Sequence, residues 1–129
     1  MSDVKLLDAL ATYSPAQIAQ LRSILRVSKY TLTFNTTQNW DLANGLYQTL
    51  TVTNNFTLNL PSNIVEGETA FIYVTQDGTG SRLITLASGF KTAGGTGITL
   101  STAAGAIDRL MLFFNTSTTC TITVTKDIK

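Results

Sequence analysis

Apolar and polar residues alternate along most of the chain after residue 29, which is the period expected of β-strands with one buried face. In residues 30–34 the side chains of Tyr30, Leu32 and Phe34 fall on one side of the pattern, and two threonines fall on the other. Threonine is abundant throughout, and β-branched residues favour pleated strands. Comparable strand-like runs occur at residues 50–53, 56–60, 83–86 and 119–125.

Two further segments are apolar at successive positions rather than at alternate ones. Residues 69–75 and 110–114 therefore predict central strands that are covered on both faces. About eight short strands, separated by turns rich in glycine, asparagine and proline, predict a mainly β fold. We expect an antiparallel β-sandwich with jelly-roll-like topology over residues 29–129.

The first 28 residues have a helical pattern and form a separate N-terminal segment. Ser14-Pro15-Ala16-Gln17 predicts a helix start, in which Ser14 and Gln17 form a capping box. Helices this short are unstable alone, so their apolar side requires a surface, either on the β domain or on another protein. That side and its basic neighbours are the candidate anchor or oligomer interface: Leu6, Leu7, Leu10, Ile18, Leu21, Leu25, Arg22 and Arg26.

The composition excludes several classes of function. The 129 residues have a formal net charge of +1, with 13% charged and 43% hydrophobic residues. This balance argues against disorder and against a nucleic-acid-binding protein, which needs many cationic contacts to phosphate. The absence of histidine removes Ser-His-Asp catalysis and histidine-ligated metals, and we expect no metal and no other cofactor. The one cysteine, Cys120, is expected to be a small buried hydrophobic residue.

The sequence shows no sign of a membrane segment or of a secretory signal. Its longest apolar run is far shorter than the ~20 residues needed to cross a bilayer. The first residues lack a basic stretch followed by an apolar block. We therefore expect no membrane partner, and synthesis in a cytoplasm.

Few residues are candidates for catalysis. Glu66 and Glu68 share one face of a strand and could flank a sugar as an acid–base pair, but the charged start of a strand explains them more simply. The Gly-rich segment 77–81 lacks the Gly-Lys-Ser/Thr of a phosphate-binding loop and predicts a tight hairpin instead. We therefore predict that the protein is not an enzyme.

An aromatic loop is the main candidate for ligand binding. Trp40 lies between amide and carboxylate side chains, in the segment Asn39-Trp40-Asp41-Leu42-Ala43-Asn44, and Tyr47 follows soon after. A ring in such surroundings can serve as a platform on which a sugar stacks. The alternative is that Trp40 closes the end of the sandwich as part of the core. The candidate ligand loop therefore consists of Trp40, Asp41 and Tyr47, with both interpretations open.

Residues 55–114 resemble a group of virion proteins from tailed bacteriophages. The resemblance rests on a strand that runs into Gln-Asp-Gly-Thr-Gly-Ser-Arg at residues 76–82, and on the later segments Ile84-Thr85-Leu86, Gly94-Gly95 and Ala106-Ile107-Asp108. The group includes tail-fibre domains, head fibres and capsid-decorating proteins, which are commonly trimeric β-sandwiches. Related domains often continue with a Gly-Thr-Asn-Trp hairpin, and residues 114–119 here have neither the glycine nor the tryptophan.

The turn at residues 76–82 has a structural interpretation of its own. Gln76 and Arg82 flank it and are placed to bond across it, while the Asp77 side chain can form an Asx turn. Asp108 is a candidate partner for Arg82 or Arg109. The predicted structural turn consists of Gln76, Asp77, Gly78, Gly80, Arg82 and Asp108.

The resemblance implies a structural component of a phage virion, made in the host cytoplasm. Our first hypothesis is a capsid decoration (cement) or head-fibre protein that binds the major capsid protein, or another virion protein, through its N-terminal helices. We expect a homo-oligomer, namely a trimer. The alternative is a tail-fibre or receptor-binding module that recognises a host cell-surface glycan. A glycan depolymerase ranks last, because one small domain is too short to build a long substrate groove.

Overall fold

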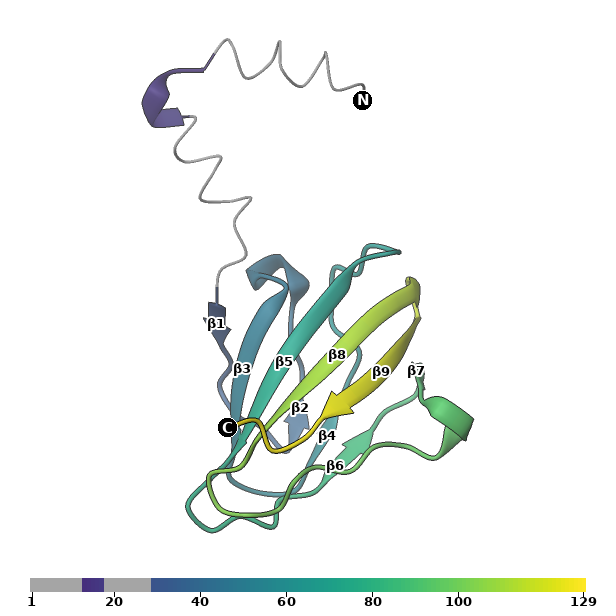
Figure 1. Cartoon of the computed structure of the whole chain (residues 1–129). Helices are drawn as coiled ribbons and strands as arrows, with labels where there is room; N and C mark the ends of the chain where they lie inside the picture. The colour runs from purple at the N-terminus through teal and green to yellow at the C-terminus, as the bar shows by residue number, and fades with distance from the viewer. Residues whose placement is uncertain (1–12, 18–28) are drawn as a thin grey trace.

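The computed structural model describes residues 13–17 and 29–129. Residues 29–129 form two β-sheets packed face to face around one core (Figure 1). The larger sheet contains, in spatial order, β1 (Lys29–Thr31), β3 (Tyr47–Val52), β5 (Thr69–Gln76), β8 (Ile107–Thr116), β9 (Thr119–Thr125) and β7 (Phe90–Lys91). The smaller sheet contains β2 (Thr37–Gln38), β4 (Phe56–Leu58) and β6 (Ile84–Leu86). The prediction of a mainly β sandwich is confirmed.

Along its first six strands the chain alternates between the two sheets. It adds β1, β3 and β5 to the larger sheet and β2, β4 and β6 to the smaller one. Every neighbouring pair among these six strands is parallel. This part of the chain therefore winds around the core as a coil of three turns. Antiparallel pairing begins only with β5–β8 and the β8–β9 hairpin, and β7 pairs parallel to β9.

This winding corrects the prediction of an antiparallel, jelly-roll-like sandwich. The described part of the smaller sheet is entirely parallel, and the larger sheet is mixed. The prediction was wrong on this point because alternating apolar and polar positions look the same in parallel and in antiparallel strands. Short connections that cross from one sheet to the other replace the hairpins that the turn signals indicated.

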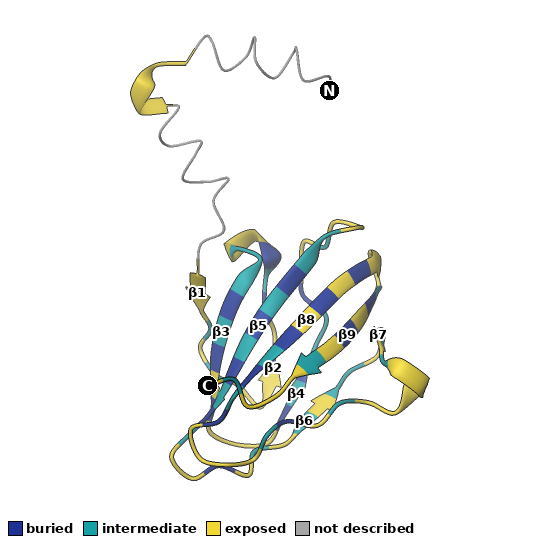
Figure 2. Cartoon of the chain, in the orientation of Figure 1, coloured by how far each residue is buried: buried dark blue, intermediate teal, exposed yellow. Residues whose placement is uncertain are grey.

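The core lies between the sheets and takes alternate residues from β3, β4, β5, β8 and β9 (Figure 2). In the strands predicted at residues 50–53, 56–60 and 119–125, the apolar residues of the alternating pattern thus lie on the buried face. Cys120 is among the fully buried residues, and burial raises the pKa of its thiol to about 11, as expected of an inert hydrophobic position. The buried cluster consists of Trp40, Leu42, Leu50, Val52, Phe56, Leu58, Ala70, Ile72, Val74, Leu100, Leu110, Leu112, Phe114, Cys120 and Ile122.

The prediction that β5 and β8 are covered on both faces is wrong. The side chains that point away from the smaller sheet are large and apolar, yet Met111 is 39% and Phe113 is 42% exposed. The described residues form two layers, and none of them forms a third layer over this side. We call this surface the outer face and define it by Tyr47, Phe71, Tyr73, Arg109, Met111 and Phe113.

Residues 13–17 contain the predicted helix start. The backbone N–H of Ser14 donates to Gln17 Oε1 (2.8 Å), and the N–H of Gln17 donates to Ser14 Oγ (3.2 Å), which are the two bonds of a capping box. No helix in the described part of the chain is long and apolar enough to cross a membrane. The whole candidate anchor lies outside the described residues: Leu6, Leu7, Leu10, Ile18, Leu21, Arg22, Leu25 and Arg26.

Candidate functional site

A polar hollow of about 580 Å³ lies at the side of the sandwich where β1 and β2 are the edge strands of their sheets. We call it the edge hollow. Its lining comes from β1, the β1–β2 connection, β2, the segment that follows β2, and one residue of the β4–β5 connection. The lining residues are Tyr30, Leu32, Thr33, Asn35, Thr37, Gln38, Asn39, Trp40, Asp41, Asn44 and Ser62.

Gln38 holds the β1–β2 connection in place. Its side chain is 2% exposed, and its Oε1 accepts a hydrogen bond from the backbone N–H of Asn35 (2.8 Å). Its Nε2 donates to the carbonyl oxygens of Thr33 (3.3 Å) and Asn39 (3.0 Å). One buried side chain thus satisfies three backbone groups in a segment with little regular structure. This arrangement fixes the positions of the polar side chains along the hollow.

Trp40 belongs to the core and is not a ligand platform. Its side chain is only 5% exposed, and its indole N–H donates to the carbonyl oxygen of Asn59 (2.8 Å). A sugar needs an accessible ring face for stacking, and this ring is covered. The structure therefore favours the alternative interpretation of Trp40, and the platform hypothesis for this residue is corrected.

Asp41 contributes an ordered carboxylate to the edge hollow. Its Oδ1 accepts hydrogen bonds from Asn63 Nδ2 (2.7 Å) and from the backbone N–H of Ala43 (2.8 Å). The bond from Asn63, followed by that from Ala43, holds the pKa of the Asp41 carboxyl below its ordinary value of 3.8. Asp41 is therefore ionised at neutral pH, and its carboxylate is fixed in orientation.

Tyr47 does not lie at the hollow. Its ring is on the outer face, where it packs edge to face against Tyr73 with the ring centres 5.2 Å apart. The neighbouring residue Gln48 instead points to the interior, and its Nε2 donates to the carbonyl of Asp41 (2.7 Å). Because successive strand residues point to opposite faces, Trp40, Asp41 and Tyr47 do not form a single ligand loop.

Two residues that give the hollow its character were not predicted from the sequence. Tyr30 is 39% exposed and supplies an accessible aromatic ring, and Asn35 supplies an amide. The density of asparagine around residues 35–44 was a visible signal. That Tyr30 lines the same hollow as Asn44 depends on the winding of the chain, which the sequence pattern did not reveal.

The chemistry of the edge hollow suits binding of a polar ligand. Amide and hydroxyl side chains both donate and accept hydrogen bonds, as the hydroxyl groups of sugars require. Asp41 is the one carboxylate among the lining residues, whereas acid–base hydrolysis of a glycoside uses two. Glu66 and Glu68, the pair considered from the sequence, do not line it.

The segment from Gln76 to Arg82 is a corner between the sheets rather than the predicted hairpin, because it joins β5 of the larger sheet to β6 of the smaller one. The bonds across it are present. Gln76 Nε2 donates to the carbonyl of Arg82 (2.9 Å), and Gln76 Oε1 accepts from the backbone N–H of Arg82 (3.0 Å). Gln76 Nε2 also donates to the carbonyl of Ser101 (2.9 Å), which ties the corner to the segment before β8.

Asp77 and Gly80 fix the conformation of the corner. Asp77 Oδ1 accepts from the N–H groups of Thr79 (3.3 Å) and Gly80 (2.9 Å), and Oδ2 pairs with Arg82 Nη2 (2.8 Å). The guanidinium of Arg82 is the main cause of a lowered pKa of Asp77. Gly80 has φ +73°, and a Cβ there would lie 2.5 Å from the carbonyl oxygen of Thr102, whereas Gly78 has open space around it. Only glycine fits position 80 without a shift of the backbone.

Asp108 pairs with neither Arg82 nor Arg109, which corrects the prediction. It is 2% exposed; its Oδ2 accepts from the backbone N–H of Ser101 (2.6 Å) and its Oδ1 from that of Asp127 (2.8 Å). Arg109 is the next residue along β8 and therefore points to the outer face. Asp108 instead joins the segment before β8 and the segment after β9 to the core strand.

A family model described as "Putative phage tail fibre C-terminal domain" matches residues 35–119. The matched range runs from the β1–β2 connection to the first residue of β9, and is well over half of the 129 residues. The chain belongs to this family. No curated protein and no solved structure matches the chain.

Membership identifies a structural phage protein that is associated with the virion. It favours the tail-fibre alternative over our first hypothesis of capsid decoration or a head fibre. The match spans the corner at residues 76–82 without singling it out. The candidate anchor in residues 1–28 lies outside the matched range, so its role and the trimer stay predictions.

Proposed function

We propose that this tail-fibre domain is a non-catalytic host-recognition module, and that it binds a cell-surface glycan in the edge hollow. The observation that carries the proposal is the tail-fibre family match over residues 35–119. That range contains Asn35, Asn39, Asp41 and Asn44 of the lining. A domain of a tail fibre is a candidate for contact with the host surface, and this polar hollow is the feature of the domain best suited to that contact.

The geometry supports a sugar as the ligand. The amides of Asn35, Asn39 and Asn44 offer donors and acceptors to ring hydroxyl groups, and the ionised carboxylate of Asp41 accepts further ones. Tyr30 provides an exposed ring for the apolar face of a sugar. Gln38 and Asn63 hold the surrounding segments through the hydrogen bonds described above, so little ordering is needed on binding.

Binding of the purified chain to whole host cells tests the proposal. We expect the chain to bind cells and to compete with virions for adsorption. Mild periodate oxidation of the cells, which cleaves vicinal diols of surface glycans, should abolish the binding. Binding that survives oxidation would mean a protein receptor and would contradict the glycan assignment.

A paired substitution locates the binding site. The double variant Asn35→Ala/Asn44→Ala changes two side chains of the hollow whose amides form no hydrogen bond to another described residue, so the fold should persist. We expect cell binding to fall at least tenfold. The matched control is Asn115→Ala, which removes an exposed amide at the far end of β8 and should leave binding unchanged. Equal binding by the double variant and the control would exclude the edge hollow.

The position of the protein on the particle separates this function from capsid decoration. Electron cryomicroscopy of purified virions should show its density at the tail, whereas regular density over the capsid lattice would restore our first hypothesis. We also keep the prediction that residues 1–28 attach the protein. Deletion of these residues should then leave a folded β domain, judged by circular dichroism, that is no longer incorporated into virions.

A further inference from the structure

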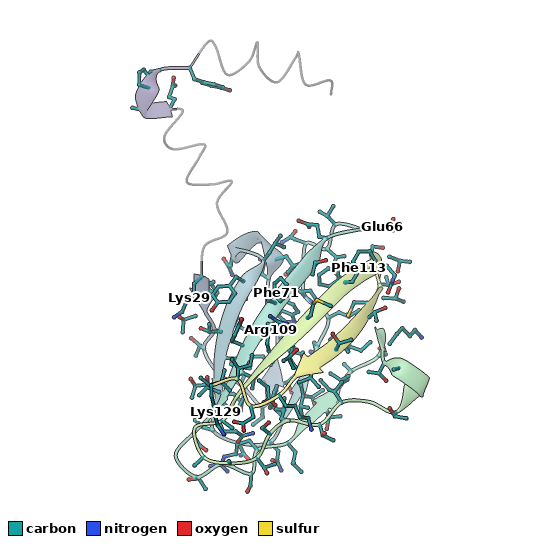
Figure 3. The ribbon with its side chains drawn as sticks, in the orientation of Figure 1. Lys29, Glu66, Phe71, Arg109, Phe113 and Lys129 are labelled. Atoms are coloured by element: carbon teal, nitrogen blue, oxygen red, sulfur yellow. The ribbon has the colours of Figure 1, made fainter. Side chains whose placement is uncertain are left out.

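The edge hollow contains a single charged side chain, and its charge is negative. Asp41 supplies this charge, and no lysine or arginine is among the described residues of the lining. The basic residue of β1, Lys29, stands in register with Tyr47 and therefore points to the outer face. Figure 3 shows Lys29 and Arg109 on the larger sheet. The described part of the chain thus gives the hollow an anion without a cation to balance it.

The surroundings of the Asp41 carboxylate differ from those of two other carboxylates in the described residues. Asp77 is paired with Arg82 (2.8 Å), and Asp127 is paired with Lys129 (3.0 Å). In contrast, both donors to the Asp41 carboxylate are uncharged, one an amide side chain and the other a backbone N–H. The carboxylate therefore keeps a net negative charge toward the hollow, and its orientation is fixed.

Two neutral residues with oxygen acceptors lie beside this carboxylate. Both hydrogen bonds to Asp41 end on Oδ1, so Oδ2 keeps capacity for a donor from a ligand. The N–H of Leu42 donates to the carbonyl of Ser62 (3.1 Å), and the N–H of Asn44 donates to the carbonyl of Asp41 (3.2 Å). Asp41 and Ser62 also form a β-bridge. The backbone thus brings Asp41, Asn44 and Ser62 together, and all three line the hollow.

A primary ammonium group matches this arrangement. It carries one positive charge and three N–H donors, and it has no acceptor, so a carboxylate, an amide oxygen and a hydroxyl oxygen suit it together. From these observations we infer that the glycan bound in the edge hollow carries a free amino group, and that Asp41 selects this group. The inference rests on the proposed function, because it names the class of sugar that the same hollow takes.

The same arrangement disfavours the other common classes of sugar. A sugar that bears a carboxylate or a phosphate brings a like charge toward Asp41, with no basic residue in the described lining to offset the repulsion. An N-acetylated sugar keeps its hydroxyl groups but has no charge on nitrogen. It would cover the carboxylate without supplying a counter-charge, which is unfavourable. The remaining lining is neutral and contacts the ring and its hydroxyl groups in every case, so Asp41 makes the difference between the classes.

The first test compares one glycan in three chemical forms. Surface glycan is released from host cells and freed of protein, and its affinity for the full chain is measured by isothermal titration calorimetry. N-acetylation with acetic anhydride removes the positive charge of each amine and should weaken binding at least tenfold. Reductive methylation of the amines adds bulk but retains the charge, so this form should keep more of the affinity than the acetylated form does.

The outcomes of this test separate the inference from the proposed function. Equal affinity for the unmodified and the N-acetylated glycan would overturn the choice of an amino sugar and leave the edge hollow as a glycan site. Weaker binding of the methylated form than of the acetylated form would also contradict a role for the charge. Absence of binding to all three forms would overturn the proposed function together with the inference.

A pair of isosteric variants tests whether Asp41 provides the selectivity. Asp41→Asn removes the negative charge but retains Oδ1, which accepts both hydrogen bonds, so the fold should persist. Its affinity for the unmodified glycan should fall at least tenfold, and its preference over the N-acetylated form should disappear. The matched control Glu66→Gln removes a carboxylate that does not line the hollow and should behave like the wild type. A preference that survives in Asp41→Asn, with an unchanged circular dichroism spectrum, would refute the role of Asp41.

Discussion

The two faces of β8 have nearly the same hydrophobicity and entirely different surroundings. Leu110, Leu112 and Phe114 are completely buried between the sheets, whereas Met111 and Phe113 are about two-fifths exposed. On the inner face the polar residue Asp108 has both carboxylate oxygens satisfied, and on the outer face the Nε of Arg109 has no hydrogen-bond partner among the described residues. The inner face is packed within the sandwich, whereas the described residues leave part of the outer face exposed.

The largest expected effect is a difference in the free energy of unfolding between variants of two adjacent phenylalanines. Phe114→Ala removes a fully buried ring and should lower the free energy of unfolding by about 3–5 kcal/mol. Phe113→Ala should cost less than about 1 kcal/mol at protein concentrations where the chain is monomeric. Urea unfolding over a range of protein concentrations measures both values. Equal losses for the two variants in the monomer would mean that the faces do not differ in the way described.

A smaller effect is expected at the polar pair on the same strand. Asp108→Ala leaves the N–H groups of Ser101 and Asp127 without their acceptor and should cost about 1–3 kcal/mol in the same assay. Asp108→Asn retains one oxygen acceptor and should cost less. Arg109→Ala should change monomer stability least of the three, and a loss larger than that of Asp108→Ala would reverse the comparison.

The smallest effect concerns the partly exposed corner at the end of the inner face. The pKa of Asp77 is lower in the folded protein than its ordinary value of 3.8, so its ionised form stabilises the fold. This contribution is fully present above pH 3.8 and is lost as the pH falls through the folded pKa. The urea concentration at the midpoint of unfolding should therefore decrease as the pH is lowered from 5 to 2.5. In the variant Asp77→Asn this decrease should be smaller. Because Asp41 also has a lowered pKa, part of the slope should remain in the variant.

The sequence predicted most strands but neither their pairing nor the coverage of their outer face. Alternation of apolar and polar residues reveals that a strand has a buried face, and it located β3, β4 and β9 in this way. Continuous apolar runs located β5 and β8. Parallel and antiparallel neighbours impose the same alternation, so the coil of the first six strands was not recognised. The apolar residues at Phe71 and Met111 implied a second covering layer, since sequence hydrophobicity does not distinguish the chain's own core from a surface for a partner.

The candidate site was predicted in part for a similar reason. The segment around Trp40 does line a hollow, but the role of its tryptophan depends on the carbonyl of Asn59, which lies 19 residues away in sequence. The ring that is accessible belongs to Tyr30, on a different strand. In contrast, the bonds of Gln76 with Arg82 are local, and the sequence was sufficient to anticipate them.

The coiled path of the first six strands predicts the order in which parts of the protein fold. Lys29 pairs with Tyr47 and Phe56 with Ile84, so the parallel partners are 18 to 28 residues apart, whereas β8 and β9 meet through a tight turn between Thr116 and Thr119. Long loops must close before parallel pairs form, which slows folding, and the C-terminal hairpin is the element that forms most readily on its own. During synthesis β5 emerges well before its neighbour β8, and until β8 arrives its open edge can pair with other nascent chains. Refolding from urea should accordingly be slow and lose yield at high protein concentration.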